Sequence, residues 1–206
     1  MNDTADVVVI GGGIVGCATA YNLARLGAGK VVLLERDYLA SGATGRCGAG
    51  MRMQWGTETN CLLSRESTRM LEQLPELLDV DIDIELKQGG YLLLAYTEKM
   101  AAQFKKNLQL QNSLGIPSRW VTPAEAKEIV PHLNTAGLLG ATFCAKDGHC
   151  NPFKATAAYA KAAERHGVEI RTNSEVTGIE AECCRITGVK TRWGTISTPR
   201  VVVAAG

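Results

Sequence analysis

The chain has 206 residues, of which 46% are hydrophobic and 21% charged, which is typical of a globular protein with enough apolar material for a core. Its 22 basic and 21 acidic residues nearly cancel, so we predict neither nucleic acid nor anionic lipid as a partner. The most apolar stretch, residues 7–20, is interrupted by four glycines and is shorter than the ~20 residues of a membrane helix, so we predict no membrane span.

The cellular location is predicted from the N-terminus and the cysteines. Asp3 and Asp6 stand where a secretory signal would carry positive charge, and the seven cysteines are odd in number and scattered. We therefore expect reduced thiols and a cytoplasmic protein. Cys144, His149 and Cys150 form a loose group without a C-x-x-C pair, so we predict no metal site.

The first forty residues have the pattern of a β-α-β unit. Residues 7–10 are a short β-branched run that ends in glycines, residues 14–26 favour a helix, and residues 30–34 form a second apolar run. Both runs are apolar throughout, which is typical of parallel strands that are covered on both faces.

The turn between the first strand and the helix has the spacing G-x-G-x-x-G. Gly11 permits a tight turn, Gly13 lets a pyrophosphate approach the backbone, and Gly16 lets helix and strand pack closely. Glu35 ends the second strand, where its carboxylate can accept hydrogen bonds from ribose hydroxyls. An ordinary turn and a solvated Glu35 are the alternative, but the order of strand, helix, strand and acid favours a dinucleotide site.

The middle of the chain changes character. Residues 41–50 form a loop of small residues, residues 57–78 favour a helix, and residues 84–86 and 90–95 favour strands. Residues 97–115 form a polar helix, a capping box begins another helix at Thr122, and residues 138–144 favour a strand. We interpret these elements as a small antiparallel α+β insertion.

The last part returns to α/β alternation. Asn151 and Pro152 predict the start of a helix that ends near His166, followed by short strands over 168–170, 175–180, 186–191, 195–197 and 201–204. The predicted division is therefore a first dinucleotide-binding part over residues 1–83, part of an inserted domain over 84–150, and a second dinucleotide-binding part over 151–206; the family resemblance described next implies that these are FAD-binding parts and part of a substrate-binding domain.

Three motifs resemble the D-amino-acid oxidase-like family of FAD-dependent oxidoreductases, whose members include glycine oxidase, sarcosine oxidase and the β subunits of dye-linked proline dehydrogenases. They are residues 6–16 with 33–36, the loop 41–51, and the late pieces 151–152, 175–176 and 201–206. The resemblance implies FAD as cofactor and a Rossmann-like FAD-binding domain with an inserted antiparallel α+β substrate domain, apparently truncated. It also implies that the backbone of Val176 contacts adenine and that residues 204–206 close over the cofactor.

The candidate cofactor-binding residues combine these motifs. They are Gly11, Gly13, Ile14, Val15, Gly16, Glu35, Arg36, Thr44, Gly45, Arg46, Gly48, Ala49, Gly50, Met51, Val176, Ala204, Ala205 and Gly206. In the second loop, small residues leave room for backbone N–H groups to reach phosphate, and Thr44 adds a hydroxyl donor; a plain surface loop is the alternative. Arg46 and Arg52 are candidates for neutralising a phosphate or a substrate carboxylate, and the alternative is that both are ordinary solvated arginines. We assign no chemical role to Cys47.

The resemblance also predicts the reaction. We expect oxidation of a small amino acid or secondary amine, of the glycine, sarcosine, proline or D-amino-acid type, by hydride transfer to flavin N5. The alternatives are an FAD-dependent dehydrogenase of a hydroxy acid or glycerol phosphate, and a non-catalytic FAD-binding subunit or fragment. Family members carry a second half that grips the substrate carboxylate, so we expect those groups beyond Gly206, an inactive 206-residue chain and no catalytic residue within it. The predicted partners are a small-molecule substrate and other subunits of a hetero-oligomer.

Overall fold

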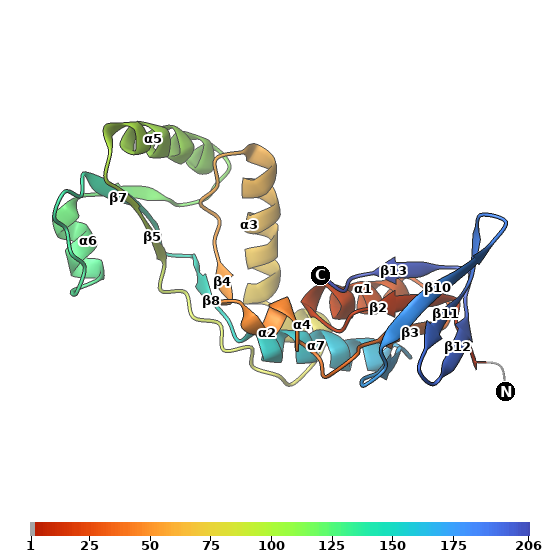
Figure 1. The fold of residues 1–206 in the computed structure, drawn as a ribbon. Coiled ribbons are helices and arrows are strands. Elements are labelled where there is room, and N and C mark those ends of the chain that lie inside the picture. The colour runs from red at the N-terminus through yellow and green to blue at the C-terminus, as the bar shows by residue number, and fades with distance from the viewer. Residues whose placement is uncertain (1–2) are drawn as a thin grey trace. The chain divides into compact units, whose positions relative to one another are not determined.

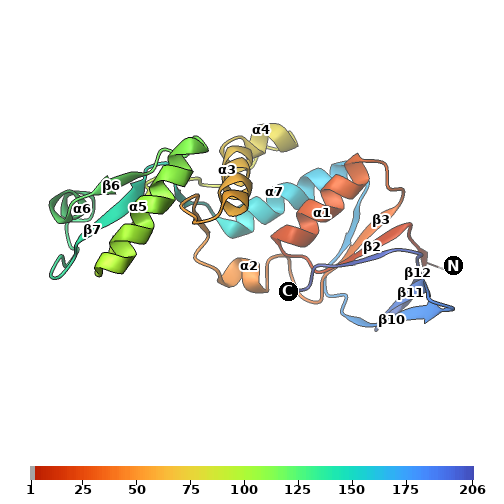
Figure 2. The ribbon, with the colours of Figure 1, turned by 90° about the horizontal axis from the view of Figure 1, so that it is seen from above.

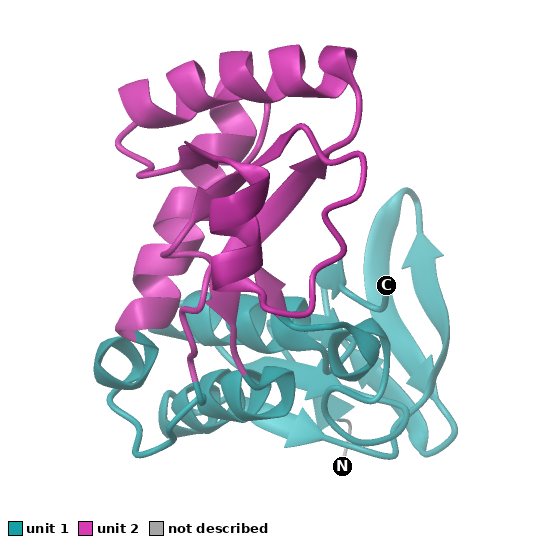
Figure 3. Ribbon diagram, turned by 90° about the vertical axis from the view of Figure 1, so that its left-hand side faces the viewer, with its two compact units in different colours: residues 1–49, 74–85, 151–206 teal, residues 50–73, 86–150 magenta. Residues whose placement is uncertain are grey.

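The computed structural model describes residues 3–206 and divides the chain into two compact units (Figure 3). Unit 1 comprises residues 1–49, 74–85 and 151–206, and unit 2 comprises residues 50–73 and 86–150. Residues 50–73, which the sequence analysis grouped with the first FAD-binding part, belong to unit 2. They do so because their strand and helix find their partners there, as described below.

Unit 1 contains a parallel sheet of four strands, β2 (Val7–Ile10), β3 (Val31–Leu34), β9 (Glu169–Arg171) and β13 (Val201–Val203), in the order β13-β2-β3-β9. The helices α1 (Ile14–Arg25) and α7 (Pro152–Arg165) lie side by side (Figures 1 and 2). The short helices α2 (Ala43–Arg46) and α4 (Leu74–Leu78) also contact α7. The predicted β-α-β unit is therefore present.

The central strands of this sheet are covered on both faces, as their uninterrupted apolar sequences predict. Val8 pairs with Val32, and both pack with Val189 and Ile196 of a second sheet. Because successive side chains of a strand point to opposite faces, Val9 and its neighbour Leu33 face the other side. All of these side chains are buried. The sheet thus forms the middle of a layered core.

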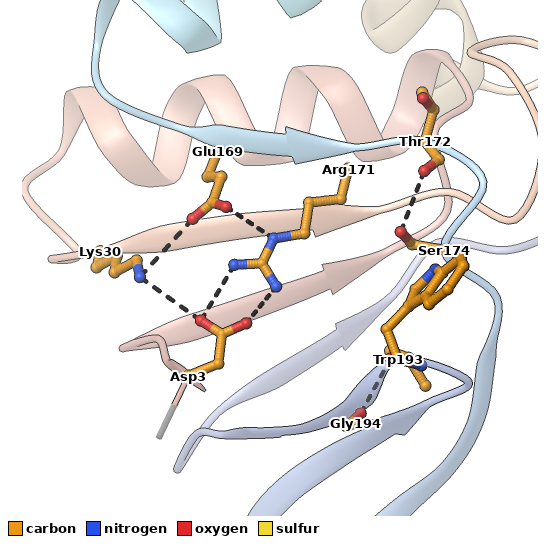
Figure 4. Close-up of polar contacts among 9 residues, drawn as sticks. Asp3, Lys30, Glu169, Arg171, Thr172, Ser174, Trp193 and Gly194 are labelled. Atoms are coloured by element: carbon orange, nitrogen blue, oxygen red, sulfur yellow. Dashed lines mark hydrogen bonds and ion pairs between the residues drawn. The ribbon is translucent and has the colours of Figure 1, made fainter. Parts of the chain in front are cut away.

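The second sheet of unit 1 consists of β10 (Val176–Glu182), β11 (Arg185–Thr191) and β12 (Gly194–Ser197), which are antiparallel, and β1 (Asp3–Thr4), which pairs in parallel with β12. Strand β1 was not among the elements predicted from the sequence. Figure 4 shows Arg171 of β9 bonded to both Asp3 and Glu169. These contacts tie the N-terminal strand to the parallel sheet.

Unit 2 contains the antiparallel sheet β5-β7-β6, formed by β5 (Tyr91–Ala95), β7 (Gly140–Cys144) and β6 (Arg119–Val121). Its helices are α3 (Glu58–Glu72), α5 (Glu98–Ser113) and α6 (Pro123–Ile129), and α3 contacts α5. The short strands β4 (Gly50–Met51) and β8 (Gly148–His149) pair with each other. The predicted antiparallel insertion and the capping box of Thr122 with Glu125 are confirmed.

Two predicted elements differ in the structure. The helix predicted over residues 57–78 ends at Glu72, because Pro75 has no N–H for the helical hydrogen bond to residue 71, and α4 then begins separately. The strand predicted over residues 84–86 is absent. Glu85 has a φ of 56°, which takes the chain out of the extended conformation. No helix among residues 3–206 is long and apolar enough to cross a membrane.

Candidate functional site

The candidate site lies at the carboxyl edge of the parallel sheet in unit 1, where several strands end together. The N–H of Gly11, directly after β2, donates to Leu34 O at the end of β3, at 2.8 Å. The N–H of Ala204, directly after β13, donates to Ile10 O at 2.7 Å. Ligands of open α/β sheets bind outside this edge. The predicted residues Gly11, Glu35 and Ala204 are therefore brought together.

Two glycines let the helix α1 begin very close to these strand ends. Gly11 has a φ of 111°, and a Cβ there would lie 2.4 Å from Ala204 O. A Cβ on Gly16 would lie 1.8 Å from Gly11 O. Side chains are therefore excluded at both positions, as the G-x-G-x-x-G spacing predicts.

The first turn of α1 is suited to an anion. Gly13 is the N-cap and has no side chain that could cap the helix itself. The first N–H groups of a helix have no partner within it, and the helix dipole adds partial positive charge at the same point. A pyrophosphate can approach this turn without meeting a side chain from residue 13. The predicted N–H donors of Ile14, Val15 and Gly16 lie in this turn.

The carboxylate of Glu35 lies against the glycine turn. One of its oxygens accepts a hydrogen bond from Gly12 N at 2.6 Å, and the other accepts from Asp37 N at 2.9 Å and from Ser41 Oγ at 3.3 Å. The side chain is only 8% exposed. Glu35 therefore organises the loop that follows β3, in addition to the predicted role toward ribose.

Gly12 and Ser41 are parts of this site that the sequence analysis missed. A Cβ on Gly12 would lie 2.8 Å from the Cβ of Glu35 and 2.7 Å from Cδ2 of Leu39. The triple glycine of the sequence was the available signal, because G-x-G-x-x-G by itself leaves the second position unrestricted. Gly12 is thus required by tertiary contact.

Thr44 connects the second loop to the first. Its Oγ1 accepts a hydrogen bond from Ile14 N at 3.1 Å, and a Cβ on Gly13 would lie 3.0 Å from the same oxygen. Thr44 belongs to the short helix α2, whose Gly45 packs against Ala40 O and the ring of Phe153. The part of the loop that includes Thr44 is thus ordered beside the first turn of α1. A hydroxyl at this point can also donate to a phosphate.

The connection between β9 and β10 runs beside the acidic end of β3. Ser174 N donates to Glu35 O at 2.8 Å, and Asn173 N donates to Asp37 O at 2.9 Å. This places the segment that leads to Val176 next to Glu35. Arg36 is exposed and pairs with Asp37 at 3.6 Å. The assignment of Val176 and Arg36 to the cofactor stays a prediction.

The remaining predicted residues are more dispersed. Gly48 and Arg46 are exposed, a Cβ added to Gly48 would have no atom of a non-neighbouring residue within 4 Å, and Ala49 has a φ of 51°. Gly50 and Met51 form β4 and belong to unit 2, where a Cβ on Gly50 would lie 2.0 Å from the hydroxyl of Tyr91. Ala205 and Gly206 follow β13 and are exposed. Their roles toward a cofactor stay predictions.

A hollow of about 390 Å³ elsewhere in unit 1 does not have the properties of a ligand site. It is lined by Asp3, Arg171, Trp193 and residues of the β11–β12 hairpin (Figure 4). Arg171 is the arginine of this hollow, and its guanidinium already forms hydrogen bonds with Asp3 at 3.1 Å and with Glu169 at 2.8 Å. Its charge is therefore neutralised within the protein. Among residues 3–206, no group of three His, Cys, Asp or Glu side chains is arranged to hold a metal ion.

The geometry of the carboxyl edge fits a dinucleotide cofactor. A glycine turn without side chains, the first turn of α1 and a buried acid at the end of the second strand are all present in one unit. Comparison with known proteins agrees, because the family model described as FAD dependent oxidoreductase matches residues 6–206. The chain belongs to this family. The resemblance stated from the sequence is therefore confirmed, and FAD is the cofactor of the FAD dependent oxidoreductases.

Individual FAD dependent oxidoreductases are similar along nearly the whole chain. The mitochondrial sarcosine dehydrogenase of Mus musculus is 34% identical, covering 98% of this chain and 22% of that protein. The sarcosine oxidase subunit beta of Arthrobacter sp is 34% identical, covering 97% of this chain and 50% of that protein. The crystal structure of L-proline dehydrogenase from P. horikoshii superposes with a TM-score of 0.90 and 38% identity, covering 99% of this chain and 53% of that one. The chain thus spans about half or less of these relatives.

Proposed function

We propose that this chain is the cofactor-binding portion of an FAD-dependent enzyme that oxidises a small amino acid with a primary or secondary amine, of the glycine, sarcosine, proline or D-amino-acid type. The single observation that carries the proposal is the glycine turn with Glu35 at the end of the parallel sheet, in a chain that matches this family from residue 6 onward. Sarcosine and proline, which appear in the names of the relatives, are both amino acids with a secondary amine.

Unit 1 supplies the groups that hold the cofactor. The backbone around Gly11 and Gly13 and the first turn of α1 would bind the pyrophosphate, because N–H groups and the helix dipole favour an anion there. Glu35 would accept hydrogen bonds from ribose hydroxyls, and Thr44 would donate its hydroxyl to phosphate. FAD, when bound, supplies the acceptor for the hydride that leaves the amine-bearing carbon.

Arg52 of unit 2 is our candidate for binding the substrate carboxylate. Its guanidinium lies over the ring of Trp55, 4.1 Å from the centroid, and no carboxylate among residues 3–206 forms an ion pair with it. An arginine can hold a carboxylate with two parallel hydrogen bonds. The family resemblance predicts carboxylate-binding groups beyond Gly206, whereas the residues alone left open whether Arg52 binds a phosphate, a substrate carboxylate or only water. This proposal assigns Arg52 to the substrate carboxylate.

The rest of the proposal concerns location and assembly. The scattered, odd number of cysteines supports a cytoplasmic protein. The similarity to a sarcosine oxidase subunit beta supports assembly with other subunits. Both are proposals for the whole protein, because this chain spans about half or less of the length of its relatives.

Spectroscopy of the purified full-length protein tests the function. We expect the absorption bands of oxidised flavin, and bleaching of these bands when sarcosine, proline, glycine or a D-amino acid is added without oxygen. Absence of flavin after reconstitution would contradict the cofactor assignment. Bleaching by lactate or glycerol 3-phosphate alone would favour the hydroxy-substrate dehydrogenase, and bound flavin that no substrate reduces would favour the non-catalytic subunit.

A further inference from the structure

A short segment of unit 2, residues 52–55, is irregular in conformation and yet strongly held. It follows β4 and precedes α3, and both Met53 and Gln54 are buried. Loops with unpaired backbone groups normally lie at the surface, because buried N–H and C=O groups need partners. The partners of this segment are side chains from distant parts of unit 2.

Asp147, in the turn between β7 and β8, holds the middle of the segment. Its carboxylate accepts a hydrogen bond from Met53 N at 2.8 Å and another from Gln54 Nε2 at 2.9 Å. Gln54 Nε2 also donates to Tyr91 O of β5 at 2.9 Å. The side chain of Asp147 is fully buried, and burial raises the pKa of its carboxyl above the ordinary value. A buried carboxylate is costly unless hydrogen bonds replace its lost contacts with water, and the two donors from the segment 52–55 do so here.

Side chains of the helices α5 and α3 hold Trp55, the last residue of the segment, by hydrogen bonds to its carbonyl oxygen. Trp55 O accepts a hydrogen bond from Gln111 Nε2 of α5 at 2.8 Å and a second, weaker one from Cys61 Sγ of α3 at 3.4 Å. Gln111 is only 2% exposed, so a polar side chain is buried for this contact. Two buried polar side chains from different parts of unit 2, Asp147 and Gln111, therefore form hydrogen bonds with the segment 52–55.

The residue that these contacts hold in place is Arg52. Trp55 Nε1 donates to Arg52 O at 3.0 Å, and the Arg52 guanidinium lies over the same indole. The Nε of Arg52 is buried and has no hydrogen-bond partner in the structure. The cation is thus held over Trp55, and no carboxylate among residues 3–206 neutralises it. Its charge also acts on Asp147, where it opposes the effect of burial on the pKa.

We propose that Asp147, assisted by Gln111, is a positioning residue that fixes the segment 52–55 so that Arg52 presents its guanidinium to the carboxylate of the substrate. The proposal rests on the proposed function of the chain. Asp147 itself touches neither substrate nor cofactor. Preorganisation of this kind matters because a misplacement of about 1 Å in a substrate-holding group can reduce the rate about a hundredfold.

A purely structural role for Asp147 makes a different prediction. Loss of the contacts would then lower the stability of unit 2 and affect all substrates equally. A positioning role predicts a selective loss for substrates that carry a carboxylate. Dimethylamine is sarcosine without its carboxylate, and pyrrolidine is proline without its carboxylate. Comparing the rates within each pair therefore separates a positioning role of Asp147 from a structural one.

The test uses Asp147→Asn, Arg52→Gln and the double variant in the full-length holoenzyme, with Val121→Ala as control. Val121 is fully buried in the separate apolar cluster of unit 2, so its variant perturbs stability at a distance from the segment. We expect Asp147→Asn to lower kcat/KM for sarcosine or proline about ten- to a hundredfold while leaving the activity with dimethylamine or pyrrolidine and the flavin content unchanged. In the Arg52→Gln background, Asp147→Asn should have no further effect, because both changes remove the same interaction.

A second readout does not depend on activity. The indole N–H resonance of Trp55, identified by its loss in Trp55→Phe, should shift in Asp147→Asn and not in Val121→Ala. An unchanged resonance, an equal loss for both substrate classes, or additive effects of Asp147→Asn and Arg52→Gln would overturn the proposal. If the wild-type protein oxidises no amine, the proposed function fails, and the resonance of Trp55 still decides whether Asp147 holds the segment.

Discussion

The backbone N–H of Gly12 donates a hydrogen bond of 2.6 Å to the carboxylate of Glu35, 23 residues further along the chain. This contact joins the glycine turn after β2 to the acid after β3, so the two halves of the dinucleotide motif are held together within the protein itself. Because the same carboxylate also accepts from Asp37 N and Ser41 Oγ, it stabilises the loop that follows.

Replacement of Glu35 by lysine should therefore have two effects. We expect a lower FAD content, because a hydrogen-bond acceptor for ribose becomes a cation that only donates, and a lower thermal stability of the apoprotein, because Gly12 N loses its acceptor. Flavin absorbance relative to protein and a melting curve measure these effects. Asp37→Asn, a change at an exposed neighbour, is the control. Flavin occupancy equal to that of the wild type would remove Glu35 from the cofactor site.

Gly16→Ala should be strongly destabilising. The new methyl group would lie 1.8 Å from Gly11 O, so α1 and the end of β2 must separate, at a cost of at least about 2 kcal/mol. Urea unfolding of the apoprotein measures the change. Gly48→Ala, where no atom of a non-neighbouring residue lies within 4 Å of the added Cβ, should leave stability unchanged and serves as the matched control. A Gly16→Ala protein as stable as Gly48→Ala would show that the close packing of α1 is wrong.

Gly48 tests the second loop separately. Nothing lies within 4 Å of a Cβ added at this residue, so Gly48→Ala should fold with normal stability. If the backbone of this loop approaches the cofactor as predicted, the same change should still weaken FAD binding, which a titration of the apoprotein with FAD measures. Unchanged affinity would assign Gly48 to an ordinary surface loop.

The ion-pair group of Asp3, Arg171 and Glu169 predicts a dependence of stability on acid pH. Hydrogen bonding to Arg171 lowers the pKa of Asp3 below its usual value of 3.8 and that of Glu169 below 4.5. A carboxyl whose pKa is lower in the folded state contributes stability that is present above its unfolded pKa and is lost as the pH falls through the folded pKa. Unfolding free energy should therefore decline as the pH falls below about 4.

Asp3→Asn isolates this contribution. The variant should be less stable than the wild type at neutral pH and should show a shallower decline toward acid, since one of the titrating groups is gone. Urea midpoints measured from neutral to acid pH give both curves. Coincident curves for variant and wild type would mean that the Asp3 contact with Arg171 adds nothing to stability, and curves offset by a constant amount would contradict the predicted pH dependence.

The turn between β10 and β11 is occupied by two cysteines in an unfavourable conformation. Cys183 and Cys184 have φ values of 47° and 63°, and the flanking Glu182 and Arg185 pair with each other. Two-residue hairpin turns of this kind prefer Asn-Gly. The double replacement Cys183→Asn with Cys184→Gly should raise the unfolding free energy by about 0.5–1 kcal/mol. The serine double variant is the control, and a replacement less stable than this control would contradict the turn geometry.

The sequence by itself determined the local parts of this protein. The β-branched runs around the glycine turn, the capping box at Thr122 and the proline-initiated helix at Asn151 are confirmed, because each follows from the local sequence pattern of a single element. The recognition of the family followed from the same motifs, which are continuous in the chain.

The tertiary structure decided what depends on distant partners. Strand β1 exists only because Asp3 pairs with Ile196 across almost the whole chain, and Gly12 is required only because Glu35 and Leu39 lie against it. Residues 52–55 owe their conformation to Asp147 and Gln111, and neither contact leaves a periodic pattern in the sequence. Hydrophobic periodicity and capping report the energetics of single elements, whereas pairing between elements depends on packing and hydrogen-bond partners that only the folded chain brings together.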